Sequence, residues 1–272
     1  MDIYSGLTCA GMKMIYGLNL NIRNQAGDWD VANVEQLLRF VKSNKLNMTL
    51  ELGNEPNSYH HKFGYTMTPQ QHAKDLNRLH KLLTKYELYL PVFGPDSTGR
   101  SKSAFDYLDN FIQLAPVDGY TYHHYSLSGY SSKKSDYLSL RSFQLFEREV
   151  KKWSKMTSRP LMLGETSVSY GGGQERATNR WLGSFLWADK LGQAATNGIQ
   201  VVMREAFLSS HYGLLGPDLK PNPDYWVTLA FKRLFVGHIC PVAIKLTNKK
   251  LRVYAAIKGS EQNFLLINFG RR

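Results

Sequence analysis

The 272-residue sequence contains little cysteine and no long apolar run. Cys9 and Cys240 are its two cysteines, so at most one intramolecular disulfide can form, and whether they pair or stay free is left open. Two half-buried thiols are the simpler expectation. No run of about 18 apolar residues occurs, so no membrane-spanning helix is expected. The N-terminal stretch MDIYSGLTCAGMKMIYG also lacks the features of a signal peptide, so the chain is either intracellular or lacks its true N-terminus.

Acidic residues are scarce relative to basic ones, with 22 Asp and Glu against 34 Lys and Arg and a formal net charge of +12. Such a surplus attracts polyanions, which include nucleic acid, anionic membrane surfaces and sulfated polysaccharide. The basic residues are scattered, and no basic stretch is interleaved with aromatics or forms a nucleic-acid-binding motif. We therefore expect no nucleic-acid partner and at most a peripheral association with membranes.

A dinucleotide-binding motif is also missing, because no Gly-x-Gly-x-x-Gly follows the first predicted strand. The sequence contains instead a series of short apolar runs, typical of strands that are buried on both faces. These runs span residues 12–18, 48–52, 89–93, 119–125, 160–164 and 199–203.

Amphipathic helical segments separate these runs. Thr68 is placed to cap one of them, with Pro69 in its first turn and Gln71 closing a capping box. Gly198 is placed to end a later helix in the left-handed conformation. Apolar residues recur at helical spacing within residues 34–41, 76–83, 143–153 and 181–188.

Alternating strands and helices imply a parallel sheet with right-handed crossovers. Six such units at this spacing fit six-eighths of a (β/α)8 barrel better than a doubly wound sheet. After a last helix at residues 223–235, residues 251–257 and 264–269 alternate as an antiparallel hairpin around Gly259-Ser260. The sequence therefore predicts an α/β fold, with a partial barrel at residues 1–240 and the beginning of an all-β domain at residues 241–272.

Polar residues collect where the apolar runs end, which is the face of such a barrel that carries catalytic groups. Two carboxylates stand out there, Glu55 in Leu-Gly-Asn-Glu-Pro and Glu165 in Leu-Gly-Glu-Thr. A retaining glycosidase needs one carboxylic acid to protonate the leaving oxygen and one carboxylate to attack the anomeric carbon, about 5 Å apart. The ionised nucleophile then raises the pKa of the acid and keeps it protonated near neutral pH. For either glutamate taken alone, a salt bridge with a rim lysine is the alternative.

The flanks of these glutamates carry a family resemblance. Residues 51–58, Glu-Leu-Gly-Asn-Glu-Pro-Asn-Ser, resemble the acid/base motif of the heparanase family. Residues 164–167 with the glycines at 171–173 resemble its nucleophile motif and the loop that follows. His123-His124-Tyr125 and residues 223–226 match its sixth strand and last barrel helix. The similarity extends from about Ile15 to Phe269.

The resemblance implies retaining cleavage of β-linked glucuronic acid in heparan sulfate, with Glu55 as acid/base, Glu165 as nucleophile and no cofactor. It also implies the roles of the substrate-binding residues, which are Asn54 for the sugar 2-OH, Tyr125 for orienting Glu165, Gly171, Gly172 and Tyr212 for a substrate carboxylate, and Arg100, assisted by Lys102, for sulfates. On sequence alone Tyr125 is equally well a rim aromatic, the glycines a plain loop, and Arg100 a solvated charge. The histidine pair lacks a second cluster with ligand spacing, so no metal site is expected.

The resemblance further implies a barrel that lacks its first two strand–helix units and most of a C-terminal β-sandwich. A companion N-terminal chain is possible, because family members are cut into two associated chains. Secretion or a lysosomal location is implied by the family, and Asn47-Met48-Thr49 would then accept a glycan. Two functions stay open: an endo-β-glucuronidase, or a catalytically inactive relative that binds heparan sulfate.

Overall fold

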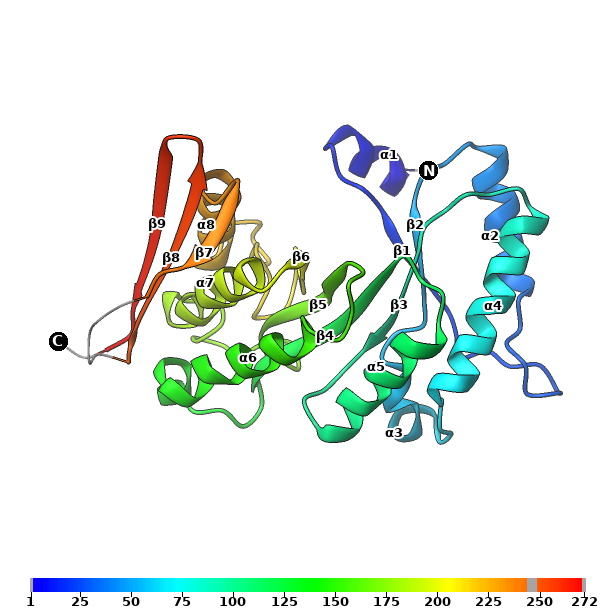
Figure 1. Cartoon of the computed structure of the whole chain (residues 1–272), viewed down its shortest axis with the longest axis horizontal. Helices are drawn as coiled ribbons and strands as arrows, with labels where there is room; N and C mark the ends of the chain where they lie inside the picture. The colour runs from blue at the N-terminus through cyan, green and yellow to red at the C-terminus, as the bar shows by residue number, and fades with distance from the viewer. Residues whose placement is uncertain (1, 244–248, 271–272) are drawn as a thin grey trace. The chain divides into compact units, whose positions relative to one another are not determined.

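The computed structural model describes residues 2–243 and 249–270 (Figure 1). The chain forms two compact units, Met1–His123 with Ser158–Pro160, and His124–Thr157 with Leu161–Arg272. A strand, β4, contributes its first half to the first unit and its second half to the second. Each unit is described separately below.

The first unit contains parallel strands that pair in the order of the sequence. Leu18 lies opposite Leu52, Leu50 opposite Val92, and Phe93 opposite Gly119. The leucines of this register are buried, as expected for strands covered on both faces. The strands are β1 (Ile15–Leu18), β2 (Thr49–Leu52), β3 (Val92–Ser97) and the first half of β4 (Gly119–Ser128).

One helix precedes the first strand of the first unit, and the others follow its strands. Thr68 caps α4, since its hydroxyl accepts the amide of Gln71 at 3.1 Å and Pro69 occupies the first turn, as predicted. Ser101 caps α5 in the same way, accepting from Ala104. The helices are α1 (Asp2–Cys9), α2 (Ala32–Ser43), α3 (Tyr59–Phe63), α4 (Pro69–Lys85) and α5 (Lys102–Leu114), with a 3₁₀ turn at Pro56–Ser58.

The second unit continues the parallel pattern. The second half of β4 is followed by β5 (Leu161–Tyr170) and β6 (Ile199–Arg204), which pair in parallel. The α7 helix ends before Asn197-Gly198, and Gly198 has φ +77°, the left-handed conformation predicted for it. The helices of this unit are α6 (Leu140–Trp153), α7 (Trp181–Thr196) and α8 (Pro223–Leu234), with a 3₁₀ turn at Lys134–Leu138.

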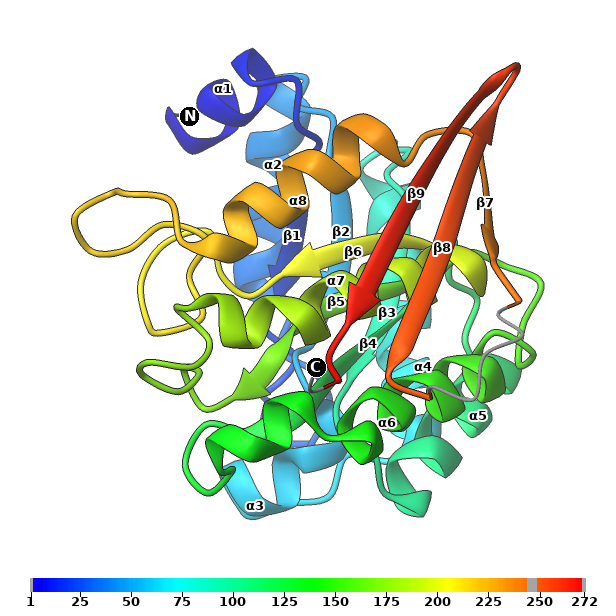
Figure 2. The same ribbon diagram turned by 90° about the vertical axis from the view of Figure 1, so that its left-hand side faces the viewer.

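An antiparallel sheet of β7 (His238–Pro241), β8 (Leu251–Lys258) and β9 (Glu261–Asn268) packs beside α7 and α8 in this unit (Figure 2). The hairpin of β8 and β9 turns at Gly259-Ser260, which confirms the prediction. Phe269 stacks on Phe143 of α6, with ring centroids 3.7 Å apart, and Tyr254 is buried against α7. The sheet therefore shares its core with the helices of this unit. The domain boundary predicted at residue 240 stays a prediction.

Two of the predicted strands begin three residues later than expected, and three extend several residues further, the third predicted strand to Ser97. The run at residues 89–93 becomes a strand only at Val92, because Pro91 has no amide proton for the ladder, and Tyr89 is 97% exposed. The first strand begins at Ile15 rather than Met12. The fourth and fifth extend to Ser128 and Tyr170. Buried polar residues such as Thr166 and Ser169 hid the second half of β5 from an apolar pattern.

Cys9 is exposed and Cys240 is half-buried, and both thiols are free. The expectation of two half-buried thiols was therefore wrong for Cys9, which lies on an α1 face without buried residues. Within residues 2–243 and 249–270, no helix combines the length and apolar character needed to cross a bilayer.

Candidate active site

Glu55 lies just after β2, on a backbone with uncommon geometry. Gly53 has φ +91° and Glu55 has φ +52°, so the chain turns sharply within three residues. Residues other than glycine rarely adopt a positive φ, and those that do cluster at functional sites. The turn is fixed by the amide of Glu55, which donates to the carbonyl of Asp96 at 2.9 Å.

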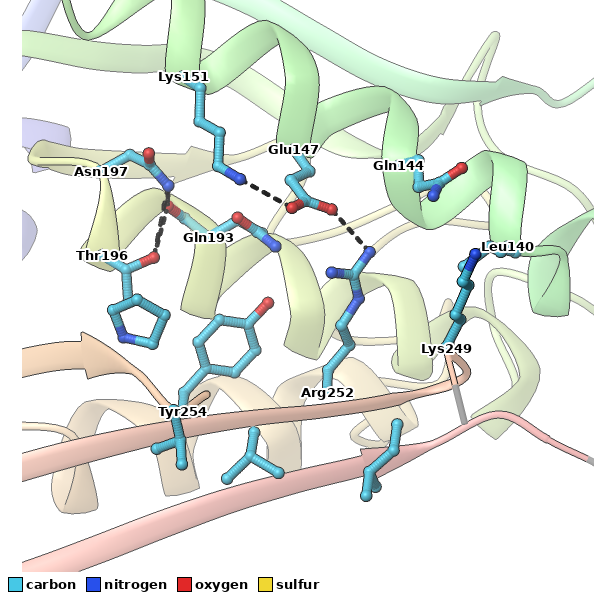
Figure 3. Close-up of a pocket in the computed structure, with 14 residues that line it drawn as sticks. Leu140, Gln144, Glu147, Lys151, Gln193, Thr196, Asn197, Lys249, Arg252 and Tyr254 are labelled. Atoms are coloured by element: carbon cyan, nitrogen blue, oxygen red, sulfur yellow. Dashed lines mark hydrogen bonds and ion pairs between the residues drawn. The ribbon is translucent and has the colours of Figure 1, made fainter. Parts of the chain in front are cut away.

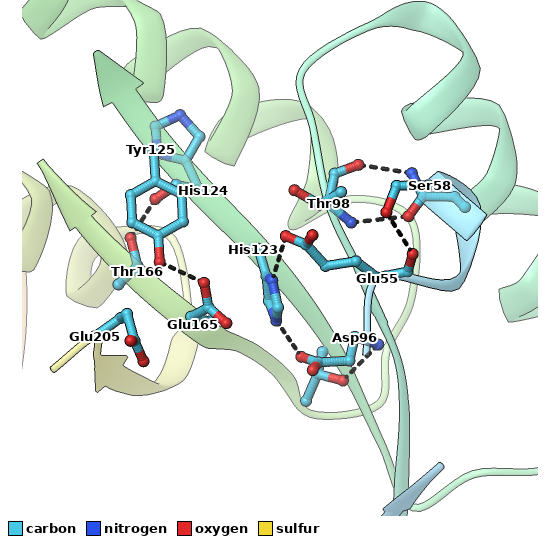
Figure 4. A network of polar contacts seen from close by, with 12 residues as sticks. Glu55, Ser58, Asp96, Thr98, His123, His124, Tyr125, Glu165, Thr166 and Glu205 are labelled. Carbon is cyan, nitrogen blue, oxygen red and sulfur yellow. Dashed lines mark hydrogen bonds and ion pairs between the residues drawn. The ribbon is translucent and has the colours of Figure 1, made fainter. Parts of the chain in front are cut away.

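The Glu55 carboxylate is held by His123, a side chain that is 1% exposed (Figure 4). Nδ1 of His123 lies 3.0 Å from Oε1 of Glu55, and Nε2 lies 2.6 Å from Oδ1 of Asp96. Asp96 reaches this position because the β3–β4 register shifts between Pro95 and Ser97. Both contacts are satisfied when the imidazole carries a proton on each nitrogen.

Lys62 of α3 makes the second contact to Glu55, with Nζ 2.5 Å from Oε2. Burial raises the pKa of Glu55, but the hydrogen bonds from His123 and Lys62 outweigh it and lower the pKa to about 2. The expectation that Glu55 is held protonated near neutral pH is therefore wrong for this structure. The physical reason is that His123 and Lys62 both stabilise the ionised form of the Glu55 carboxylate.

The other predicted residues of the first unit lie on its surface. Asn54 is exposed next to Glu55, and Arg100 is exposed on the loop between β3 and α5. Lys102 is the first residue of α5 and pairs with Asp106, with its Nζ 2.6 Å from Oδ2 of Asp106. Their proposed contacts with a sugar 2-OH and with sulfates stay predictions.

In the second unit, Glu165 lies within β5 rather than after its end. Leu163 pairs with Val202 and Thr166 with Arg204, so β5 carries one more residue than β6 over this stretch. This irregularity is a β-bulge, a feature that re-aims side chains and is common beside active sites. Tyr125 of β4 donates its hydroxyl to Oε1 of Glu165 at 2.5 Å, so the predicted contact between them is present (Figure 4). Burial and this hydrogen bond raise the pKa of Tyr125 well above its ordinary value.

A buried lysine supports the backbone around Glu165 and Tyr125. Lys190 of α7 is 2% exposed, and its Nζ lies 2.9 Å from the carbonyl of His124 and 2.5 Å from that of Ser167. It also lies 2.9 Å from Oγ1 of Thr166. Lys190 thus binds the residue before Tyr125 and the two residues after Glu165.

Tyr212, predicted to contact a substrate carboxylate, has partners within the second unit. Its hydroxyl donates to Oε1 of Glu205 at 3.1 Å, and its carbonyl accepts from Arg204 at 2.6 Å. Burial and the carboxylate of Glu205 raise the pKa of Tyr212 to about 12. Arg204 is itself paired with buried Asp224 at 2.8 Å. The predicted role of Tyr212 stays a prediction, since a substrate would have to share the hydroxyl with Glu205.

The glycine loop after β5 adopts a conformation that requires glycine. Gly171, Gly172 and Gly173 all have φ between +73° and +83°. The carbonyl of Gly172 accepts the amide of His211 at 2.8 Å, which fixes the loop. The binding of a carboxylate by the amides of Gly171 and Gly172 stays a prediction.

The sequence interpretation missed Lys62 and Lys190. It placed Asp96 and His123 at the ends of predicted strands, and it weighed His123 in a histidine pair and in the family resemblance, but it assigned neither residue a contact with Glu55. In this structure each ring nitrogen of His123 faces a carboxylate. The buried position of Lys190 carried a signal, because its helix is apolar on both sides of Asp189-Lys190.

Comparisons with known proteins agree with this description. The family "Glycosyl hydrolase family 79, N-terminal domain" matches residues 2–192. Heparanase from Mus musculus is 36% identical over 93% of this chain and 49% of its own length. Hyaluronoglucuronidase from Hirudo nipponia is 33% identical over 90% of this chain and 53% of its own length. Inactive heparanase-2 from Homo sapiens is 29% identical over 93% and 46%. The chain thus spans about half the length of these relatives.

Solved structures show the fold. A 4-O-α-L-rhamnosyl-β-D-glucuronidase from Fusarium oxysporum superposes with a TM-score of 0.75 at 18% identity, over 98% of this chain and 60% of that one. A β-xylosidase from Caulobacter crescentus gives 0.63 at 14% identity, over 94% of this chain and 59% of that one. The predicted TIM-barrel type of α/β fold, with an antiparallel sheet after it, is confirmed.

Proposed function

Because this chain belongs to glycosyl hydrolase family 79, the heparanase family, we propose that it is a retaining endo-β-glucuronidase acting on heparan sulfate or a related acidic glycosaminoglycan. The observation that carries the proposal is the pair of strand-associated glutamates, each with its own hydrogen-bond donor. Glu55 follows β2 and contacts His123, and Glu165 lies at the β5 bulge and accepts from Tyr125. Retaining cleavage of a glycosidic bond needs two carboxyl groups that are held in fixed positions.

In the proposed reaction Glu165 attacks the anomeric carbon of the glucuronide. The bond from that carbon to the glycosidic oxygen breaks, an ester to Glu165 forms, and Glu55 gives its proton to the leaving oxygen. Glu55 then removes a proton from water, which attacks the same carbon and releases Glu165. The hydroxyl of Tyr125 donates to Glu165 and holds its carboxylate in one orientation.

The acidic substrate class rests on charge and on the predicted binding residues. The net charge of +12 favours a polyanionic substrate, and the similar protein from Hirudo nipponia is named a hyaluronoglucuronidase. Asn54 would bind the 2-OH, the amides of Gly171 and Gly172 with Tyr212 would bind the carboxylate, and Arg100 would meet sulfates. No cofactor, metal or nucleic acid belongs to the proposal.

A secreted or lysosomal location and a companion N-terminal chain are also part of the proposal. Asn47 of the sequon is exposed, so a glycan could be attached there in a secretory compartment.

The test compares Glu55→Ala and Glu165→Ala on two substrates, a heparan sulfate oligosaccharide and 4-nitrophenyl β-glucuronide. Loss of the acid should slow oligosaccharide cleavage by about 10²–10⁴. It should slow formation of the glycosyl-enzyme from the nitrophenyl substrate far less, because that leaving group departs without a proton. Loss of the nucleophile should abolish both reactions. Glu261→Ala, an exposed glutamate on β9, is the control. Wild-type rates of oligosaccharide cleavage in either variant would disprove the role assigned to that residue.

The second candidate is an inactive protein that binds heparan sulfate, which the similarity to inactive heparanase-2 favours. A wild-type chain that binds heparin in a salt-sensitive way but turns over neither substrate would support this candidate against the enzyme.

A further inference from the structure

Tyr130 is an aromatic residue whose backbone is fixed although 79% of its surface is exposed. It follows β4 in a turn in which its own amide donates to Oγ of Ser128 at 3.2 Å. The amide of the preceding Gly129 donates to the carbonyl of Tyr170 at 3.0 Å. A Cβ on Gly129 would lie 2.4 Å from the carbonyl oxygen of Gly173, so only glycine fits there. The turn is therefore pressed directly onto the glycine loop.

The ring of Tyr130 lies against Gly171 of that loop. A Cβ on Gly171 would come within 2.3 Å of Cε2 and 2.5 Å of Cζ of the ring, so one part of the ring covers the Gly171 backbone. The ring of Tyr170 meets it edge-on, with centroids 6.2 Å apart and an interplanar angle of 66°. These contacts hold the ring in place and leave most of its surface open to solvent.

Further hydrogen bonds join the turn and the loop into one layer. Nε2 of Gln174, at the end of the loop, donates to the carbonyl of Ser132 at 2.9 Å, and the amide of Ser132 donates to Ser128. A ring ordered by its surroundings loses little conformational freedom when a ligand binds, which favours affinity. An exposed aromatic ring fixed in this way beside a glycine loop is typical of binding surfaces rather than of cores.

We propose that Tyr130 is a stacking platform for a sugar ring of the glycan, next to the sugar whose carboxylate occupies the glycine loop. This proposal rests on the proposed function and names a further subsite of the same site. A pyranose whose ring substituents are equatorial presents axial C–H groups on its faces, and these pack on an aromatic ring. The exposed Lys133 and Lys134 that follow add positive charge near an acidic glycan. The platform selects chains of two or more sugars over a single glucuronide.

The test measures steady-state kinetics of three variants, Tyr130→Ala, Tyr130→Phe and Tyr130→Trp. The two substrates are a heparan sulfate oligosaccharide and 4-nitrophenyl β-glucuronide. Tyr130→Ala should raise KM for the oligosaccharide about three- to tenfold with kcat nearly unchanged, a loss of the size expected for one aromatic contact. Its KM for the single-sugar substrate should not change. Phe and Trp should keep wild-type KM, since they keep the ring. Tyr89→Ala, which removes another exposed tyrosine, is the control.

Equal KM values for Tyr130→Ala and wild type on the oligosaccharide would overturn the platform. A loss in Tyr130→Phe equal to that in Tyr130→Ala would also overturn it, because the hydroxyl and not the ring would then matter. Unchanged thermal midpoints identify a loss that is not due to misfolding. If the wild-type chain turns over neither substrate, the proposed function fails while the platform is still tested. Calorimetric binding of the oligosaccharide should then weaken three- to tenfold in Tyr130→Ala, and equal affinity would reject the platform.

Discussion

At the scale of single residues, the charge on Glu55 is governed by the side chains that donate to it. His123 and Lys62 lower its pKa to about 2 against the opposing effect of burial. A general acid must carry a proton when the reaction begins. An anionic glycan that takes Lys62 as its own partner would remove one of these donors, and the pKa of Glu55 would then rise toward its usual range. In the proposed reaction, substrate charge and proton transfer would be coupled in this way.

Lys62→Met should shift the pH dependence of kcat/KM. Removing the ammonium removes an effect that lowers the pKa of Glu55, so the carboxyl stays protonated to higher pH. The alkaline limb of the profile should therefore move up by about one pH unit. Lys74→Met, which breaks an exposed pair with Asp28 in the same unit, should leave the limb in place. A limb that stays fixed or moves down in Lys62→Met would contradict this role of Lys62.

The two glutamates, and Tyr125 as the partner of Glu165, could be found from the sequence and its family resemblance, whereas the partners of Glu55 could not. Asn-Glu-Pro and Gly-Glu-Thr follow apolar runs, and that local pattern marks a strand end with a carboxylate. His123 is 68 residues from Glu55 and reaches it only through the β3–β4 pairing and the shifted register at Asp96. Lys62 reaches it through the short α3 helix, whose position depends on the left-handed turn at Glu55. Such contacts depend on backbone geometry that a periodic pattern does not encode.

At the scale of elements, α7 supports β4 and β5 of the second unit through Lys190. Its ammonium has three oxygen acceptors and also lies 5.4 Å from the centre of the Phe146 ring. An ammonium group offers three donors, so these acceptors satisfy its charge in a buried place. It binds the carbonyl of His124, directly before Tyr125, and the carbonyl of Ser167, two residues after Glu165. The helix therefore fixes the spacing of the two strands where the chemistry is proposed.

Lys190→Met should destabilise the fold by about 3 kcal/mol or more, since it leaves buried carbonyls that accepted from a charged donor. Where the variant folds, kcat should fall more than KM changes, because Glu165 and Tyr125 lose their support. Urea unfolding and steady-state kinetics measure the two effects. Lys151→Met, which removes a surface partner of Glu147 on α6, is the control. A stability loss under about 1 kcal/mol would show that the buried lysine has no such role.

The elements themselves followed from the sequence where the local signals agreed. The Thr68 cap and the apolar stripe of α4 point to the same helix, and Gly198 marks the end of α7. The extension of β5 to Tyr170 did not follow, because Thr166, Ser167 and Ser169 are polar residues buried by tertiary contacts. Ser169, for example, is paired with the hydroxyl of Tyr137 at 2.7 Å. A buried polar strand cannot be recognised until its hydrogen-bond partners are known.

At the scale of the whole molecule, a buried acid links the stability of the second unit to pH. Asp189 of α7 is 2% exposed and accepts the hydroxyl of Tyr254 at 2.6 Å, with Nε of Arg252 at 3.9 Å. Arg252 also pairs with Glu147 at 2.8 Å, in a pocket where α6 and α7 meet the antiparallel sheet (Figure 3). Burial raises the pKa of Asp189 to about 7, although Tyr254 and Arg252 oppose the effect. Because the unfolded value is near 3.8, the folded state binds this proton more tightly.

Between about pH 4 and pH 7 the folded chain keeps a proton on Asp189 that the unfolded chain has released, so rising pH favours unfolding. Asp189→Asn has no such proton but can still accept from Tyr254. The unfolding free energy of the wild type, taken relative to this variant, should therefore fall by up to about 1.4 kcal/mol per pH unit across the window. Urea titrations at intervals from pH 4 to pH 8 measure the difference, with exposed Glu175→Gln as the control. A difference that is flat or rises with pH would show that Asp189 is ionised in the folded state. A falling difference means that Asp189, the buried acid that joins α7 to the antiparallel sheet, contributes most to stability when it is neutral.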